Sequence, residues 1–583
     1  MMSCRIAIVG FVASTWAVLQ STAGTPFESL TLKPANLPAF AFFGSGAPPP
    51  VADLDQDGWP DLVTFAVGVS WPDGHSGAGY AAYGPHFTKF AKFGDWVDED
   101  DLAQGLAAAD FDGDGHVDIA FGSFLAKVQG AAQSGRAFVT WGPSFQTGIE
   151  LKGPPAAPVL SFGLEMVSAD ADLDGQPDLI VSSFGYDAGT APGGNDNGRL
   201  DVYLASSGWS HLRTSDYRVD PLVPEPLAGG QTLGTSMGSG DFDGDGVAEI
   251  LAWEGHTYSG PGFLSTGSIV VLDPPGVVLS SQISAPNGSG SFGTCPRTAD
   301  FNGDGFPDIA TGAPKSNGPG GESGAGHVRI LYGPTFTSGR TLYSTYPQVG
   351  AEFGNQVAVG DLNRDGWPDV VGGSWDEDSP TLVSMGRAVL FYGPAFTTTQ
   401  VFEGEHSSEY FATALRVADL DRDGFPELIV TAPNHGTTGA IKIFRHRALA
   451  TTAPASISLQ VGASIPLDID AGALSANEVY FVLGSLSGSM PGFDVPSGSD
   501  VVHLHHNWDP LTNLMLAVAN SPFLPGFAGT LDAQGRGAAN LNWPAGVGSP
   551  ALVGQELTLA LVAGKSNGQV TFGSTALTFS LTP

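Results

Sequence analysis

Short apolar runs alternate with acidic, glycine-containing turns along most of the chain, and the pattern recurs every 57 to 71 residues. An apolar residue and a small one usually stand eight residues before each acidic turn, as in Phe353-Gly354. A β-branched run such as Leu428 to Thr431 follows the turn, and another apolar run opens on Gly about 20 residues later. Several of these lead through Tyr/Trp-Gly-Pro-x-Phe into a fourth short strand. Four strands per repeat predict the blades of a β-propeller.

The acidic turns themselves place oxygen-bearing side chains at positions 1, 3, 5 and 9 of a nine-residue loop, with Gly at position 6. Crowded carboxylates repel one another unless a cation neutralises them. Ligands that are all oxygen atoms favour a hard ion, and a flexible loop suits Ca²⁺ better than Mg²⁺. An EF-hand is excluded, because position 12 of the first loop is Thr64 and the flanks have strand composition. The seven loops read DLDQDGWPD from Asp53, DFDGDGHVD from Asp110, DADLDGQPD from Asp170, DFDGDGVAE from Asp241, DFNGDGFPD from Asp300, DLNRDGWPD from Asp361 and DLDRDGFPE from Asp419.

Composition narrows the range of partners. The 583 residues carry a formal net charge of −36, which disfavours nucleic acid and anionic membranes as partners. Only 14% of the residues are charged, and 26 of the 59 Asp and Glu residues lie in the seven loops. The acidity is therefore concentrated where cation binding is predicted.

The first 23 residues have the pattern of a secretory signal peptide. Arg5 supplies a positive start, Ile6 to Leu19 is an apolar segment, and small residues at 21–23 offer a cleavage site before about Gly24. Cleavage removes Cys4 and leaves Cys295 alone, so no disulfide is expected within the mature chain. The rest of the sequence contains no run of about 20 apolar residues, so no membrane span is predicted there. We expect a protein that is secreted, periplasmic or held at the cell surface.

Residues 26 to 446 resemble the FG-GAP or VCBS repeats, which build the seven-bladed propeller of integrin α-chains and of many exported bacterial proteins. The resemblance rests on the loops, the Phe-Gly pairs and the Gly-Ala-Pro ending at 312–314. It implies one Ca²⁺ per blade, up to seven ions, held by the side chains at positions 1, 3, 5 and 9 and the backbone carbonyl at position 7. These positions are Asp53, Asp55, Asp57, Trp59, Asp61; Asp110, Asp112, Asp114, His116, Asp118; Asp170, Asp172, Asp174, Gln176, Asp178; Asp241, Asp243, Asp245, Val247, Glu249; Asp300, Asn302, Asp304, Phe306, Asp308; Asp361, Asn363, Asp365, Trp367, Asp369; and Asp419, Asp421, Asp423, Phe425, Glu427.

The sequence thus predicts an all-β protein in which a seven-bladed β-propeller, residues 26–447, precedes a small β-sandwich-like domain at 455–583. Blade 7 lacks a fourth strand, and residues 26–33 are expected to supply it, which closes the ring. Blade 1 departs from the pattern, because Ser45-Gly46 stands where the other repeats have Phe-Gly, although Phe42-Phe43-Gly44 lies just before it; the sequence therefore leaves the register of this first strand open. The C-terminal region has no repeat and no predicted role.

No coherent catalytic set is present, so the leading hypothesis is a non-enzymatic binding or adhesion module for a protein or a glycan. Its ligand is expected on the face opposite the calcium loops, where four aromatic residues suit sugar rings or a protein partner: Trp71, Tyr186, Tyr258 and Trp375. These aromatics could equally pack between loops. One alternative is a carbohydrate-active enzyme resembling a polysaccharide lyase, with His256 or His435 near Arg or Lys. Another is a structural component of the cell surface.

His503-Leu-His505-His506 is a further candidate. On a strand His503 and His505 would share one face and could hold a transition metal with a third ligand. No Cys or Glu-x-x-His partner lies nearby, so an exposed polar strand end is the expected interpretation.

Overall fold

The computed structural model describes residues 19–21, 27–34, 37, 41–70, 76–93, 105–124, 126, 135–151, 161–183, 198–215, 231–241, 245–256, 266–275, 278–284, 290–451, 453–489, 492–497, 500–504, 506–547, 550–574 and 576–583. Most of the predicted signal peptide therefore lies outside the described residues. Three of its residues form β1 (Leu19–Ser21), which pairs with β2 (Phe27–Leu32).

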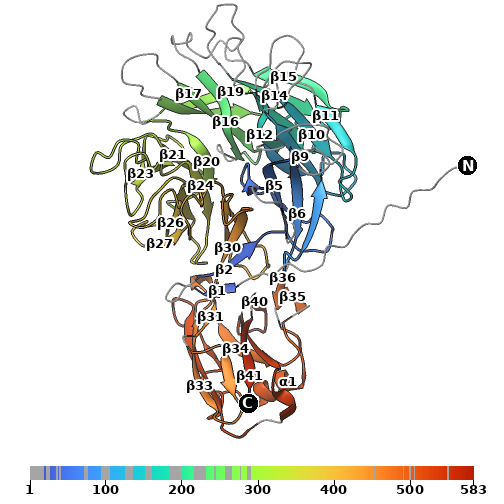
Figure 1. Ribbon diagram of the computed structural model, residues 1–583, viewed down its shortest axis with the longest axis vertical. Coiled ribbons are helices and arrows are strands. Elements are labelled where there is room, and N and C mark those ends of the chain that lie inside the picture. Colours follow the sequence, from blue (N-terminus) through green and yellow to red (C-terminus); the bar gives the residue numbers. More distant parts are fainter. Residues whose placement is uncertain are drawn as a thin grey trace, which may run out of the picture.

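Seven antiparallel sheets surround a common centre (Figure 1), which confirms the predicted propeller. Blade 1 contains β3 (Phe43–Ser45), β4 (Val51–Ala52), β5 (Asp61–Ser70), β6 (Ser76–Tyr83) and β7 (Lys89–Phe93). Blade 2 contains β8 (Leu106–Ala109), β9 (Asp118–Ser123), β10 (Arg136–Thr140) and β11 (Gly148–Leu151). Blade 3 contains β12 (Phe162–Ala169), β13 (Asp178–Ser183), β14 (Arg199–Leu204) and β15 (Ser210–Ser215). Blade 4 contains β16 (Gln231–Gly240), β17 (Glu249–His256), β18 (Thr266–Asp273) and β19 (Val278–Ser284).

The last three blades follow the same plan. Blade 5 contains β20 (Thr294–Ala299), β21 (Asp308–Gly312), β22 (Val328–Tyr332) and β23 (Ser338–Leu342). Blade 6 contains β24 (Gln356–Gly360), β25 (Asp369–Ser374), β26 (Arg387–Phe391) and β27 (Thr399–Glu403). Blade 7 contains β28 (Leu415–Ala418), β29 (Glu427–Ala432) and β30 (Ala440–His446). In blades 2 to 7 the acidic loop lies between the first and second strands, and in blade 1 it lies between β4 and β5.

The Phe-Gly pairs connect neighbouring blades. Phe353 of blade 6 forms a parallel bridge with Gly326, the glycine before the third strand of blade 5. A Cβ on Gly326 would lie 2.2 Å from the carbonyl oxygen of Phe353, so only glycine permits this approach. Blade 1 makes the same bridge to blade 7 through Phe43 and Gly439. The pair in blade 1 is therefore Phe43-Gly44 rather than Ser45-Gly46, which decides the register that the sequence left open.

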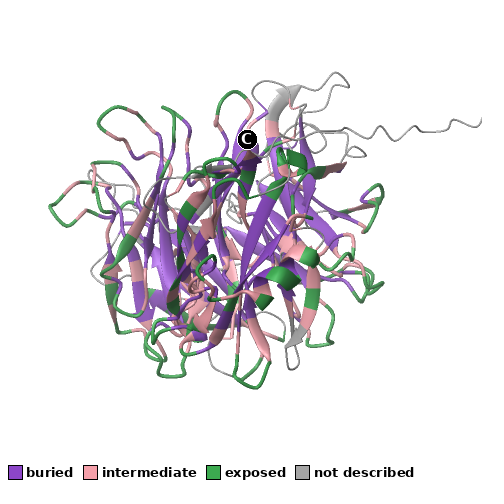
Figure 2. Cartoon of the chain, turned by 90° about the horizontal axis from the view of Figure 1, so that it is seen from below, coloured by how far each residue is buried: buried purple, intermediate pink, exposed green. Residues whose placement is uncertain are grey.

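The seven blades are held together by a buried apolar cluster at each junction. Strands contribute residues alternately to the two clusters that flank their blade, because successive side chains point to opposite faces. Ile429 and Ile443 lie between blades 7 and 1, whereas Leu428 and Val430 lie between blades 6 and 7. Figure 2 shows the buried strands, with the exposed residues gathered mainly in the turns.

The N-terminal strand β2 is the neighbour of β30 in blade 7. The two strands pair antiparallel from Phe27 opposite His446 to Leu32 opposite Ile441, and Figure 1 shows them side by side. Phe27 enters the cluster between blades 6 and 7, while Leu30 and Leu32 enter the one between blades 7 and 1. The first and last segments of the ring therefore share one sheet.

The C-terminal domain is a β-sandwich, as predicted. One sheet contains β31 (Leu449–Ala450), β33 (Ala463–Asp470) and β38 (Arg536–Trp543). The other contains β32 (Ser456–Ser458), β34 (Val479–Ser485), β37 (Ala528–Thr530), β39 (Glu556–Gly564), β40 (Val570–Gly573) and β41 (Leu577–Thr582). A separate hairpin pairs β35 (Phe493–Ser497) with β36 (Asp500–Leu504), and two short 3₁₀ turns occupy Ala473–Ser475 and Pro550–Leu552.

The domain also holds one helix that the sequence pattern did not predict, α1 (Pro510–Ala517). Asp509 caps it, accepting hydrogen bonds from the backbone of Leu511 and Thr512, and Pro510 occupies the first turn. Its eight residues are too few for a periodic signal to stand out among strands. In the described part of the chain, no helix has the length and apolarity to cross a bilayer.

Candidate metal loops and central channel

The seven acidic loops turn in the same way at positions 6 and 7, which are described in all of them. The glycine at position 6 has φ between 87° and 90° in every loop, a region that favours glycine. Its N–H donates to the Asp at position 1 over 2.8–3.0 Å in all seven loops. The N–H of position 7 donates to the Asp at position 5 over 2.8–3.0 Å. These bonds turn the carboxylates toward the inside of each loop.

Oxygen atoms converge in the loops of the first four blades. In each, three carboxylates offer atoms that lie within 4.8 Å of one another: Asp53, Asp55 and Asp57; Asp110, Asp112 and Asp118; Asp170, Asp172 and Asp178; Asp241, Asp245 and Glu249. Asp243 lies outside the described residues. In blades 5 and 6 the amides of Asn302 and Asn363 donate to the carboxylates of Asp304 and Asp365 over 2.9 and 3.0 Å.

The carboxylate at position 9, a predicted metal ligand, also makes hydrogen bonds that the sequence pattern did not reveal. The carboxylate of Asp369 accepts from Leu362 N at 2.9 Å and from Gly393 N at 2.8 Å. Asp61, Asp118, Asp178 and Asp308 make the same pair of bonds. Each thereby ties its loop to the turn after the third strand. Burial raises the pKa of Asp369 to about 8, against the lowering effect of those two N–H donors.

The Gly-Pro turn after the third strand lies so close to the acidic loop of the same blade that only glycine fits at its first position. A Cβ on Gly333 would lie 2.2 Å from the carbonyl oxygen of Pro307 in the adjacent acidic loop. We therefore expect Gly333→Ala to lower the free energy of unfolding by about 1–3 kcal/mol, as overpacking does elsewhere. Urea unfolding measures the change. Ser338→Ala, exposed in the following strand, is the matched control and should stay within about 0.5 kcal/mol. Equal stability of the two variants would contradict the contact.

The seventh loop is buried beneath the C-terminal domain. Asp421, Asp423 and Glu427 are 1%, 4% and 1% exposed. Phe425, at position 7, joins the core of the C-terminal domain and stacks on His446 with ring centroids 4.3 Å apart. Burial and the neighbouring carboxylates raise the pKa of Asp423 and Glu427 well above the ordinary values.

The sixth and first loops also contact that domain. Arg364 donates to the carbonyl oxygens of Ala471 and Thr571 at 3.1 Å and to Ser475 Oγ at 2.7 Å. The ring of Trp59 lies edge-on to His503, 4.4 Å between centroids. The C-terminal domain is thus docked on the metal-loop face of blades 6, 7 and 1, below the propeller in Figure 1.

The loops fit a hard divalent cation. Asp53 Oδ1, Asp55 Oδ1 and Asp419 Oδ1 are buried without a hydrogen-bond partner in the described structure, although buried polar atoms are normally paired. Loop 7 has a guanidinium nearby, with Arg445 Nε 3.7 Å from Asp421 Oδ2, but this pair does not reach the free oxygen of Asp419. A cation would neutralise the clustered carboxylates and take up these oxygen atoms. The backbone carbonyls at position 7 remain predicted ligands.

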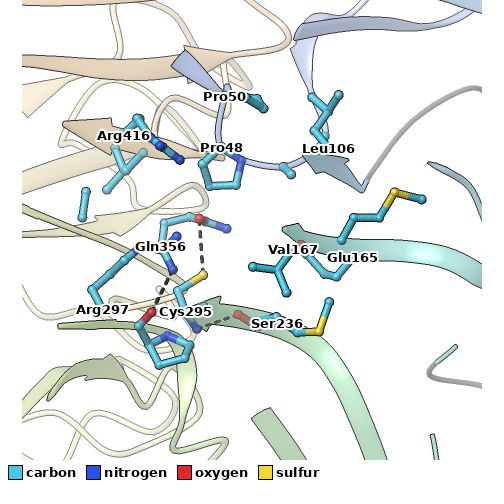
Figure 3. A pocket seen from close by; sticks show the side chains of 18 of the residues that line it. Pro48, Pro50, Leu106, Glu165, Val167, Ser236, Cys295, Arg297, Gln356 and Arg416 are labelled. Carbon is cyan, nitrogen blue, oxygen red and sulfur yellow. Dashed lines mark hydrogen bonds between the residues drawn. The ribbon is translucent and has the colours of Figure 1, made fainter. Parts of the chain in front are cut away.

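A cavity of about 780 Å³ occupies the centre of the ring, lined by the first strands of all seven blades. Figure 3 shows Glu165, Arg297 and Arg416 around this space. Beside them, Cys295 donates hydrogen bonds from Sγ to Gln356 Oε1 and from its backbone N–H to Ser236 Oγ. Burial raises the pKa of Glu165 to about 8, opposed by the charge of Arg297. The sequence pattern did not single out these residues, although Arg297 and Arg416 both stand three positions before their acidic loops.

The predicted ligand-binding aromatics are only partly placed. Trp71, Tyr186 and Tyr258 lie outside the described residues. Trp375 follows β25 at the end away from the metal loops, is half-buried, and meets Tyr410 edge-on with centroids 5.5 Å apart. Both side chains line the central cavity. Trp375 therefore packs between loops and borders the central cavity at the same time.

The histidine cluster of the C-terminal domain does not form an exposed strand end, so that expectation was wrong. His503 is 4% exposed and its Nδ1 lies 2.7 Å from Asp494 Oδ1. His506 is fully buried, with Nε2 2.9 Å from Thr512 Oγ1. His505 lies outside the described residues. Both described rings are packed at structural contacts, one of them at the domain interface.

Comparison with known protein families decides the kind of repeat. The model of the FG-GAP repeat matches residues 292–331, 353–379 and 411–444, which fall on blades 5, 6 and 7. The chain contains FG-GAP repeats. Blades 1 to 4 have antiparallel sheets of the same kind, and parallel bridges like the one between blades 5 and 6 join blade 2 to blade 3 and blade 3 to blade 4.

The chain is similar to part of several curated proteins. It is 30% identical over 229 residues to integrin alpha-IIb of Mus musculus, covering 37% of this chain and 21% of that one. It is 28% identical over 235 residues to mouse integrin alpha-8, covering 38% and 21%. It is 31% identical over 227 residues to phosphatidylinositol-glycan-specific phospholipase D of Bos taurus, covering 36% and 25%. The chain thus matches a quarter or less of the length of these relatives.

Proposed function

We propose that this protein is a secreted, calcium-stabilised propeller that binds a protein or glycan ligand without catalysing a reaction. The acidic loops would each hold one Ca²⁺ through the side chains at positions 1, 3, 5 and 9. Bound Ca²⁺ supplies positive charge that neutralises the clustered carboxylates. Similar copies in every blade favour a structural role for the ions over a local catalytic one.

The position of the C-terminal domain supports a ligand site on the opposite face of the propeller. The C-terminal domain is docked on the metal-loop face, where Arg364 and Phe425 enter its contacts. The opposite face carries Trp375 and Tyr410 at the border of the central cavity. A cavity of this size lies within the usual range of ligand pockets, and paired aromatic rings suit either sugar faces or a protein side chain. The integrin relatives are consistent with a binding role.

A glycan array together with a screen of extracellular proteins tests the proposal. Wild-type protein in Ca²⁺ is expected to bind at least one ligand, and Trp375→Ala should weaken that binding about tenfold or more. Trp508→Ala, an exposed tryptophan of the C-terminal domain, is the matched control and should bind as wild type. If Trp508→Ala lost the ligand and Trp375→Ala kept it, the ligand would not bind on the face that carries Trp375. Release of unsaturated sugars from an anionic polysaccharide would instead establish the lyase alternative.

A further inference from the structure

Two histidines and two glutamates gather on the propeller face opposite the acidic loops, in blade 7 and the segment leading into it. Glu405 and His406 follow β27, and His435 follows β29. One ligand atom from each of these three residues lies within 4.8 Å of the other two. The arrangement is separate from the acidic loops and combines nitrogen with oxygen donors. We propose that Glu405, His406 and His435 form a binding site for a divalent transition-metal ion, Zn²⁺ fitting best.

The buried carboxylate of Glu409 positions the two histidines. Glu409 is fully buried, and its Oε1 lies 2.7 Å from Nδ1 of His435. Its Oε2 accepts from the backbone N–H groups of Glu405 and His406 at 2.5 and 2.9 Å, and lies 3.4 Å from Nδ1 of His406. Metal-binding histidines commonly face such a carboxylate with one nitrogen and the metal with the other. Glu409 therefore fixes the ring of His435 through a hydrogen bond to Nδ1 and lies beside Nδ1 of His406, and in the proposed site Nε2 of each ring would face the ion.

The donor set is the reason to choose Zn²⁺ rather than Ca²⁺. Two imidazoles and one carboxylate match a common three-residue zinc set, which leaves a fourth position for water or a ligand. Imidazole suits zinc, copper and nickel, whereas Ca²⁺ and Mg²⁺ prefer oxygen alone. The side chains are accessible, at 42%, 58% and 14% exposed for Glu405, His406 and His435.

One side chain competes with the ion for Glu405, and the cluster also has an explanation that needs no metal. Lys442 donates to Glu405 Oε1 at 2.6 Å, so the metal would use the other oxygen or displace this cation. Without a metal, Glu409 and His435 are simply a hydrogen-bonded pair that fixes the loop. In that case His406, which is mostly exposed, would have no role in metal affinity.

Zn²⁺ titration of untagged protein in saturating Ca²⁺ separates the two accounts, because Ca²⁺ occupies any site made of oxygen atoms. Calorimetry should show one strong Zn²⁺ site in the wild type. His406→Ala leaves the fold intact because its ring is exposed, and His435→Gln keeps a donor toward Glu409. Each is expected to weaken Zn²⁺ binding at least tenfold, whereas His86→Ala, an exposed histidine of blade 1, should not.

Cobalt supplies a second readout that a merely structural role would not change. Co²⁺ bound to this set should give visible absorption bands, which both histidine variants lose. Glu409→Gln should weaken affinity about 10–100-fold, as loss of an orienting carboxylate does. Failure of the wild type to bind Zn²⁺ below about 100 µM, or unchanged affinity in both histidine variants, would overturn the proposal.

Discussion

Phe27→Ala is expected to destabilise the propeller by about 3–5 kcal/mol, the cost of removing a buried aromatic ring. Phe27 is 1% exposed and meets Phe402 of blade 6 edge-on, with centroids 5.3 Å apart. It lies on β2, which pairs with the last strand of blade 7. The substitution therefore opens a cavity at the point where the two ends of the ring meet.

The change can be measured by urea unfolding in Ca²⁺. Lys33→Ala, just beyond the same strand and exposed, is the matched control and should change stability by less than about 0.5 kcal/mol. If Phe27→Ala unfolded at the same urea concentration as the control, β2 would contribute nothing to the closure of the ring.

Arg364→Ala is expected to release the C-terminal domain from the propeller. The guanidinium makes three hydrogen bonds to that domain and lies 5.1 Å from the ring centroid of Phe572. Burial lowers its pKa, and the nearby charges of Asp423 and Glu478 oppose this. Its loss leaves the carbonyl oxygens of Ala471 and Thr571 without this donor, at a cost of roughly 3 kcal/mol or more.

Limited proteolysis checks this result, since cleavage between β30 and β31, where the chain passes from the propeller to the C-terminal domain, should accelerate in the variant. Arg422→Ala alters the same position of the neighbouring loop and removes a hydrogen bond to Gly58 O. It should cost only about 1 kcal/mol and leave proteolysis unchanged. Equal cleavage of Arg364→Ala and wild type would show that the domain is held by other contacts.

The repeat could be predicted because its signals are local. Each acidic loop, its glycine and the strands beside it recur at nearly constant spacing, so seven weak patterns reinforce one another. The register of the first strand of blade 1 stayed open because Phe43-Gly44 stands ten residues before its loop rather than eight. The bridge from Phe43 to Gly439, two residues far apart in sequence, shows which pair is equivalent.

What the sequence did not show depends on contacts between distant segments. Arg364 stands at the same position of its acidic loop as Arg422 does, yet it is Arg364 whose side chain reaches Ser475 in the other domain. The double role of Asp369 requires knowledge of where Gly393 lies. His406 and His435 stand 29 residues apart, with no motif that links them to Glu409. Such sites follow from the closed ring and become visible only after it is built.

The most direct test of the account is the thermal stability of the wild-type protein with and without divalent cations. Each occupied site adds about 2.7 kcal/mol when free Ca²⁺ is a hundredfold above its dissociation constant, and several such sites should together raise the melting temperature by roughly 10 °C or more. Differential scanning calorimetry of chelator-treated protein, before and after Ca²⁺ is restored, measures this. A large, reversible increase that Mg²⁺ reproduces only weakly is the predicted result. An identical melting temperature in chelator and in Ca²⁺ would contradict the assignment of the acidic loops as calcium sites.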